Sequence, residues 1–247
     1  MPQGASATMT KLEICVETPE GAALAAATGA DRIELCAALD LGGLTPGAGL
    51  LAAGIGAGCP VHAMVRPRAG GFAVGAADLA AMEGDIAAIR AAGAAGVVIG
   101  AARPDGTLDI AALSRLRDAA GPLEVTLHRV IDLCPDPHAA VEAAIDLGLT
   151  RILTSGGPGA APDNVAALAA LVRQAAGRIE IMAGGGVTPA AVPDLLAAGV
   201  DAIHASCAAP VDTGAPGIGI PRGRSTDPAR LAALKAALSK TSEALCA

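Results

Sequence analysis

The chain has 247 residues and is acidic, with 24 acidic against 17 basic side chains and a formal net charge of -7. It contains one Phe and no Trp or Tyr. It therefore lacks both the basic face that holds phosphate backbones and the rings on which single-stranded bases stack, which excludes a nucleic-acid-binding role. The hydrophobic content of 53% is sufficient for a sizeable core.

Neither a membrane span nor a secretory signal is expected. The longest uncharged stretch, residues 41–65, contains seven Gly and two Pro, which suit a membrane-spanning helix poorly. The first ten residues lack the basic start and the apolar run of a secretory signal. We therefore expect a cytoplasmic protein without membrane contact, whose six Cys are reduced. No CxxC or CxxH spacing indicates a structural zinc site.

Eight short β-branched runs alternate with Ala- and Leu-rich segments along the chain. They predict strands at residues 12–16, 31–36, 61–65, 96–100, 123–128, 150–154, 179–183 and 201–205. A helical pattern follows each strand, and a capping residue before Pro predicts helix starts at Thr18, Thr45, Asp136, Thr188 and Asp227. This alternation predicts an α/β fold, a single-domain (β/α)8 TIM barrel at residues 11–247, after a flexible tail at residues 1–10.

An open, doubly wound sheet is the alternative fold. Its first strand is usually followed by a GxGxxG turn, and residues 16–19 contain no such motif. Residues 208–223, AAPVDTGAPGIGIPRG, are expected to form a long loop between the eighth strand and the last helix.

The alternation of side chains along each strand predicts which of them face the barrel axis. In the first strand the apolar residues pack on helices, so Glu13 and Cys15 point inwards. The same parity directs a polar and sulfur-containing set inwards from the other strands: Glu34, Cys36, His62, Met64, Arg66, Thr126, His128, His204 and Ser206. Function in such barrels lies at the carboxyl ends of the strands, so this set marks a candidate site.

Burying Glu13, Glu34, Arg66 and His128 together is costly unless the groups pair or hold a ligand. One interpretation is a ligand pocket at the mouth of the barrel. The alternative is an ion-pair network in which the charges satisfy one another and simply close the top of the barrel.

The loop after the seventh predicted strand contains three consecutive glycines, Gly184, Gly185 and Gly186, shortly before an expected helix start. Gly allows backbone amides to approach an anion closely, and loops seven and eight of barrels commonly bind phosphate. Ser206, at the end of the eighth strand, offers a hydroxyl to the same anion. The alternative interpretation is a tight turn without a ligand.

Cys15 and Cys36 occupy equivalent places near the ends of neighbouring strands. Parallel neighbours lie about 4.8 Å apart, so the two thiols are candidates to share a soft ion such as Cu(I), with Met64 as a third ligand. The alternative is that both are small buried hydrophobic side chains. Cys134 and Cys207 lie in top loops, and the sequence leaves their roles undecided.

Several long blocks carry a specific resemblance, in this order: LEICVETPEGAALAAATGADRIELCA, GGLTP, MVRPRAGGF, TLHRVIDLCPDP, RILTSG and IMAGGGV. From about Lys11 to Ser206 the chain resembles the copper homeostasis protein CutC family. The resemblance implies a (β/α)8 barrel, a homo-oligomer and a role in intracellular copper handling. It implies Cu(I) ligands at Cys15 and Cys36, and a polar pocket at Glu13, Glu34, Arg66, Arg68, His128, Arg129 and Asp132.

Two functions remain open from the sequence. The first is a cytoplasmic copper homeostasis protein that holds Cu(I) between Cys15 and Cys36. The second is a lyase, isomerase or hydrolase acting on a small anionic or phosphorylated substrate. Its expected catalytic groups are Glu13, Glu34 and His128, which would exchange protons, and Arg66, which would hold a carboxylate or phosphate bidentately. Its anion site is the one proposed at residues 184–186 with Ser206. A scaffold role without chemistry is a third, blander possibility.

Overall fold

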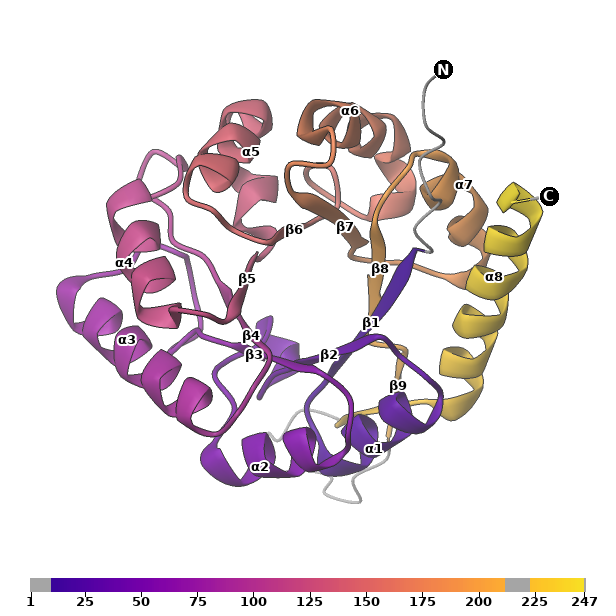
Figure 1. Ribbon diagram of the computed structural model, residues 1–247, viewed down its shortest axis with the longest axis horizontal. Helices are drawn as coiled ribbons and strands as arrows, with labels where there is room; N and C mark the ends of the chain where they lie inside the picture. Colours follow the sequence, from indigo (N-terminus) through magenta and orange to yellow (C-terminus); the bar gives the residue numbers. More distant parts are fainter. Residues whose placement is uncertain (1–9, 212–222, 247) are drawn as a thin grey trace, which may run out of the picture.

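The computed structural model describes residues 10–211 and 223–246, so most of the predicted N-terminal tail lies outside the described residues. Eight parallel strands form a closed barrel, in chain order and with β8 paired to β1. Figure 1 looks along this barrel and shows the helices around it. The strands are β1 (Lys11–Val16), β2 (Arg32–Leu35), β3 (Val61–Met64), β4 (Gly96–Ile99), β5 (Glu124–Leu127), β6 (Arg151–Thr154), β7 (Glu180–Gly184) and β8 (Ala202–Ala205). The predicted (β/α)8 fold is confirmed.

One helix follows each strand and covers the outside of the barrel. The helices are α1 (Pro19–Ala27), α2 (Ala48–Gly56), α3 (Ala76–Ala91), α4 (Ile110–Ala120), α5 (Pro137–Asp146), α6 (Val165–Ala175), α7 (Val192–Ala197) and α8 (Pro228–Cys246). Short 3-10 turns lie at η1 (Leu39–Leu41), η2 (Arg129–Leu133), η3 (Ala161–Asp163) and η4 (Pro189–Ala191). No helix among residues 10–211 and 223–246 is both long and apolar enough to cross a bilayer.

The predicted helix starts are confirmed at three positions and need correction at two. Thr18 and Asp136 accept hydrogen bonds from the first turns of α1 and α5, and α8 begins directly after Asp227. Thr45 does not open a helix, because its backbone N–H and its hydroxyl both bond the backbone of Arg66 and hold this segment extended beside β3. Thr188 opens only the 3-10 turn η4.

The stretch after β8 contains more regular structure than a loop. β9 (Ala208–Pro210) pairs antiparallel with β10 (Arg224–Thr226), which corrects the prediction of an unstructured connection over 208–223. Residues 212–222 lie outside the described residues. The strand pair brings the beginning of α8 back to the carboxyl end of the barrel.

The side-chain parity predicted from the sequence is confirmed. Leu12, Ile14 and Val16 are buried between β1 and the helices, whereas Glu13 and Cys15 are buried inside the barrel. At the amino ends of the strands Arg151 contacts four side chains. They form, with it, a cluster that we call the ionic plug: Arg151, His62, Glu124, Thr126 and Glu180. The plug closes the bottom of the barrel below the candidate site.

Candidate functional site

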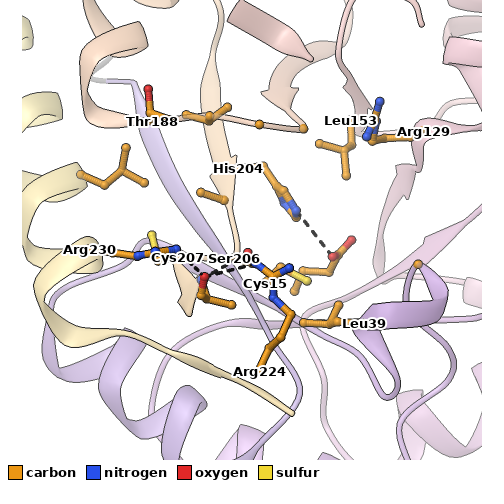
Figure 2. A pocket seen from close by; sticks show the side chains of 18 of the residues that line it. Cys15, Leu39, Arg129, Leu153, Thr188, His204, Ser206, Cys207, Arg224 and Arg230 are labelled. Atoms are coloured by element: carbon orange, nitrogen blue, oxygen red, sulfur yellow. Dashed lines mark hydrogen bonds and ion pairs between the residues drawn. The ribbon is translucent and has the colours of Figure 1, made fainter. Parts of the chain in front are cut away.

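The carboxyl ends of the strands surround a cavity of about 990 Å³, which we call the mouth cavity. Its lining combines apolar side chains with acids, arginines, imidazoles and two thiols (Figure 2). The chemically reactive members are Cys15, Glu34, Arg66, His128, Arg129, His204, Ser206, Cys207, Arg224 and Arg230. Seven of the ten predicted site residues therefore reach one cavity: Cys15, Glu34, Arg66 and His128, together with Gly185, Gly186 and Ser206 on the side of loops seven and eight.

Glu13 lies one level below the cavity and does not line it. In register it sits beside Arg32 on β2 and His204 on β8. Its carboxylate, which is 0% exposed, pairs with the Arg32 guanidinium and accepts a hydrogen bond from His204 Nδ1 at 2.7 Å. Burial acts to raise the pKa of Glu13, but the hydrogen bonds and charges of His204 and Arg32 outweigh it and lower the pKa to about 2. Glu13 is thus a buried anion that fixes its neighbours.

The two predicted thiol ligands lie together. The Cys15 and Cys36 sulfurs are 3.9 Å apart, and the Cys36 thiol also points at Glu34 Oε2, 3.6 Å away. Their hydrogen bond and burial raise the pKa of Cys15 well above its usual range. Burial and the Glu34 charge raise that of Cys36 to about 11, although the bond from Cys15 acts to lower it. Met64 packs in the same buried cluster, so the donor chemistry fits a soft monovalent ion.

Cys36 is sealed from the mouth cavity, whereas Cys15 reaches it. Gly43 lies directly over Cys36, and a Cβ at this glycine would come within 3.0 Å of the sulfur. Gly43 has a φ of +84°, so a larger residue is disfavoured here both by the backbone and by the sulfur. Only the Cys15 side of the thiol pair is open to an incoming ligand.

Glu34 and His204 complete a second group around Cys15. One ligand atom from each of the three residues lies within 4.8 Å of the other two. Glu34 Oε1 is buried without a hydrogen-bond partner, and His204 Nε2 is 3.7 Å from Glu34 Oε2, the contact drawn in Figure 2. Burial raises the pKa of Glu34. Burial acts to lower the pKa of His204, but the charge of Glu34 and the bonds to Cys15 and Glu13 raise it well above its usual value.

Arg66 and His128 are positioned more tightly than the sequence analysis anticipated. The Arg66 guanidinium donates to the carbonyls of Leu41, Gly43 and Gly70, so it holds two loops, and its buried Nε alone lacks a partner. This arrangement leaves little of the fork for the bidentate anion contact that we expected. Arg66 also stacks on Phe72, with Cζ 5.2 Å from the ring centre.

His128 is a neutral imidazole in the folded protein, and its predicted acid–base role stays a prediction. Burial and the charge of Arg66 lower its pKa to about 3. Its Nδ1 accepts the backbone N–H of Val130 at 3.1 Å, which assigns the ring proton to Nε2. Phe72 packs against the ring with 4.6 Å between the centroids.

The three glycines of the loop after β7 lie in two places, one inside the barrel and two at the mouth cavity. Gly185 and Gly186 line the cavity with φ values of +92° and +71°, and Ser206 lines it from the end of β8. Gly184 instead packs against Leu153 and His204 inside the barrel. The helix that follows, α7, has only six residues, so its dipole adds less than predicted from an expected full helix.

Asp132 and Arg68, two further members of the implied polar pocket, lie outside the cavity lining. Asp132 is buried beneath it and binds Arg129 Nε at 2.7 Å as well as the backbone N–H and hydroxyl of Ser155, so it positions Arg129. Arg68 points away and pairs with Asp78 at the start of α3.

Sequence reasoning missed the arginines of the last elements and the role of His204. Arg224 on β10 and Arg230 on α8 both donate to the Ala208 carbonyl and line the mouth cavity, as Figure 2 shows. Both follow the Gly- and Pro-rich connection over 208–223, and the path of that connection back to the barrel could not be predicted from its sequence. His204 was expected to point inwards, but its place beside Glu13 follows only from the pairing of β8 with β1.

The two remaining loop cysteines are separate from the thiol pair. Cys207 lines the cavity, and burial raises its pKa to about 11. Cys134 donates to the carbonyl of Val130 in the turn η2.

Comparisons with known proteins give a consistent result. The CutC family model matches residues 10–209, which include all eight barrel strands. A CutC family protein of Sinorhizobium medicae is 47% identical over 237 residues, covering 92% of this chain and 95% of that protein. One from Caulobacter vibrioides is 50% identical over 207 residues, with 83% and 84% covered. The crystal structure of a candidate copper homeostasis protein CutC from Streptococcus agalactiae superposes with a TM-score of 0.76 at 30% identity, covering 80% of this chain and 99% of that one.

Proposed function

Because the chain belongs to the CutC family, we propose that it acts in copper homeostasis in the cytoplasm and binds Cu(I) through Cys15 and Cys36. The observation that carries the proposal is the 3.9 Å separation between the two sulfurs, at the edge of a cavity that Cys15 reaches and Cys36 does not. Copper is the cargo of this protein, and no chemical step is assigned to it.

The surroundings of the two thiols support a soft monovalent ion. Thiolate and thioether donors select Cu(I), and the cluster around the cysteines contributes the Met64 sulfur and the apolar side chains Val98 and Leu39. The raised pKa of both thiols means that they stay protonated without metal. An entering ion must therefore displace their protons, and Cys36 already directs its S–H towards Glu34 as a proton acceptor.

A competition titration tests this assignment. Reduced full-length protein is titrated anaerobically with Cu(I) against a chromophoric Cu(I) chelator. The double variant Cys15→Ser with Cys36→Ser is expected to bind at least about 100-fold more weakly, since ligand loss exceeds the usual effect of losing an outer partner. Cys59→Ser is the matched control, because Cys59 precedes β3 at the other end of the barrel and its thiol donates to Ala30. Unchanged affinity in the double variant overturns the assignment.

An enzyme acting on a small anionic or phosphorylated substrate is the second candidate. The observation that favours it is the size of the mouth cavity together with Arg129, Arg224 and Arg230 in its lining. Guanidinium groups bind carboxylate and phosphate strongly, and the amides of the Gly185 loop and the neutral donor His128 face the same space. The reaction class, a lyase, isomerase or hydrolase step, rests on this binding chemistry alone.

A thermal-shift screen separates the second candidate from the first. Inorganic phosphate, sugar phosphates and small carboxylic acids are compared with Cu(I) for their effect on the melting temperature. An anion response that Arg230→Gln removes supports the enzyme. Arg115→Gln is the control, because Arg115 pairs with Glu83 on the outer helices. No anion response in the wild type eliminates the anion site.

A further inference from the structure

A second ligand set shares Cys15 with the thiol pair but faces the mouth cavity. It consists of Cys15 on β1, Glu34 on β2 and His204 on β8, with one ligand atom from each residue within 4.8 Å of the others. All three line the mouth cavity, whereas Cys36 does not. The two sets therefore point in different directions from the same sulfur.

The spacing of this set is close to that of a bound ion. Zn²⁺ holds Cys sulfur at about 2.3 Å and His nitrogen or carboxylate oxygen at about 2.0 to 2.2 Å, so its donor atoms lie about 3 to 4 Å apart. From separations of up to 4.8 Å, the three side chains need to close by up to about 1 to 2 Å to reach this geometry. Their strands are neighbours in the closed sheet, which fixes the three backbones relative to one another.

Two observations independent of the spacing indicate a missing ligand. Glu34 is only 3% exposed, yet its Oε1 accepts no hydrogen bond from the protein. Buried carboxylate oxygens are costly to leave unpartnered, so this atom is the natural contact for a cation. In addition, Glu13 binds Nδ1 of His204 and leaves Nε2 directed towards Glu34. Metal-binding histidines are typically oriented in this way by a carboxylate on the other ring nitrogen.

Charge favours a dication over a monovalent ion at this set. With His204 neutral and Cys15 ionised as ligands, the negative groups are the Cys15 thiolate, Glu34 and Glu13. Arg32, which pairs with Glu13, supplies one positive charge, so a dication brings the buried cluster to neutrality. A mixed sulfur, oxygen and nitrogen donor set also suits Zn²⁺ better than Cu(I), which prefers sulfur alone.

We propose that Cys15, Glu34 and His204 form a divalent-cation site, with Zn²⁺ as the fitting ion and a fourth position open to the mouth cavity. Three protein ligands and one open position are typical of zinc that binds a water or a substrate atom. The site goes beyond the Cu(I) assignment and shares only Cys15 with it, so either proposal stands without the other.

Zinc competition against a chromophoric chelator tests the site in the full-length, reduced, metal-free protein. We expect stoichiometric Zn²⁺ binding by the wild type, weakened at least about 100-fold in Cys15→Ser, Glu34→Gln and His204→Gln. Cys36→Ser is the matched control and is expected to stay within about threefold of the wild type. His204→Gln removes a partner of the buried Glu13 and could unfold the protein. Glu34→Gln preserves the side-chain shape, so the test remains valid in that case.

Co²⁺ gives a direct spectroscopic readout of the same site. A four-coordinate ion with one thiolate produces visible ligand-field bands and a near-ultraviolet sulfur-to-cobalt band. We expect both in Cys36→Ser, and neither band in Cys15→Ser. Equal loss in the two variants, or zinc affinity that His204→Gln and Glu34→Gln leave unchanged, overturns the proposal.

Cu(I) titration of the same variants distinguishes the two metal assignments. The Cu(I) proposal predicts loss of affinity in Cys36→Ser and retention in His204→Gln, the opposite of the zinc pattern. Failure of Cu(I) binding with the zinc pattern intact therefore removes only the copper assignment. Failure of zinc binding with the Cu(I) pattern intact removes only the divalent site.

Discussion

The barrel interior handles buried polar groups in two different ways at its two ends. In the ionic plug, Arg151 is 1% exposed, and its guanidinium contacts His62, Thr126, Glu124 and Glu180. At the mouth, Glu34 Oε1 and Arg66 Nε are buried without partners, two of only three such side-chain atoms in the described residues. Buried polar groups therefore stabilise the barrel where they hydrogen-bond to one another, as in the plug. Where they lack partners, as at the mouth, they are available to a ligand.

Breaking the plug is expected to have the largest effect on stability. Arg151→Met leaves His62 and Thr126 without their cation, while Glu124 and Glu180 are partly exposed and regain water. We expect the free energy of unfolding in urea to fall by about 3 kcal/mol, the lower end for a broken buried pair. Arg115→Met, at the exposed pair with Glu83, is the control and is expected to change it by less than about 1 kcal/mol. Equal effects of the two changes would mean that the plug is no more than a surface cluster.

Low pH is expected to destabilise the protein through Glu13, which lies between the plug and the mouth cavity. Glu13 has a native pKa of about 2 against an ordinary value of 4.5, so its ionised form is favoured in the folded state. Its contribution is present above pH 4.5 and is lost as the pH falls towards 2. This amounts to about 3 kcal/mol of the free energy of unfolding.

The variant Glu13→Gln isolates that contribution from the other carboxyl groups. Urea unfolding between pH 5 and pH 2 is expected to show a flatter pH dependence in the variant, together with lower stability at neutral pH, because Arg32 loses its buried partner. Parallel pH profiles for the two proteins contradict this role for Glu13.

Sequence patterns predicted the barrel and the inward direction of its polar side chains, but not their height along the axis. Side-chain alternation predicts that both Glu13 and Glu34 point inwards and does not distinguish them. The register of β1 with β2 sets Glu13 beside Arg32 and Cys15 beside Glu34, so only Glu34 reaches the cavity. Stagger between strands is a property of barrel closure and is not contained in the alternation of any single strand.

Loop contacts were equally inaccessible to the sequence analysis. Arg66 was expected to clamp an anion, yet three backbone carbonyls from two loops occupy its guanidinium. The neutral state of His128 depends on burial and on the position of Arg66, both set by tertiary packing. Arg224 and Arg230 line the cavity from β10 and from α8, two elements whose places are set by tertiary contacts such as the pairing of β10 with β9.

Two glycines, one on β4 and one just after it, allow a finer comparison of the packing in the plug and at the mouth. An added Cβ at Gly96 would lie 2.6 Å from the His62 ring and 2.7 Å from the backbone oxygen of Glu124, neither of which has room to move. At Gly100 its three nearest neighbours would all be atoms of the His128 ring, the closest 2.1 Å away, and this ring borders the mouth cavity. Overpacking costs about 1–3 kcal/mol.

We therefore expect Gly96→Ala at the upper end of that range and Gly100→Ala at the lower end, because the His128 ring has the cavity on one side and only its bond to the Val130 N–H and its contact with Phe72 to give up. Urea unfolding measures both changes. A thermal-shift titration with inorganic phosphate is expected to differ from the wild type only in Gly100→Ala. Greater destabilisation by Gly100→Ala would show that the mouth is packed as rigidly as the plug.

The smallest expected effect on stability belongs to Glu34, and it is the most informative for function. Its protein contacts are a thiol at 3.6 Å and an imidazole at 3.7 Å, so Glu34→Gln is expected to change the free energy of unfolding by about 1 kcal/mol or less. Burial raises its pKa, so the ionised carboxylate costs stability above the usual value of 4.5 and not below it. Any difference at pH 7 is therefore a gain for the variant, and it disappears at pH 4.

If the polar groups at the mouth serve to bind a ligand, Zn²⁺ makes the wild type more stable than Glu34→Gln, the reverse of the order expected without zinc. At 100 times the wild-type Kd, Zn²⁺ is expected to raise the free energy of unfolding of the wild type by about 2.7 kcal/mol and that of Glu34→Gln by no more than about 0.4 kcal/mol. Urea unfolding at pH 7 with and without Zn²⁺ measures both values, with Cys36→Ser as the control that retains the response. If Glu34→Gln instead lowers the free energy of unfolding as much as Arg151→Met does, Glu34 has a structural role. A residue that serves to bind a ligand stabilises the fold only when that ligand is bound.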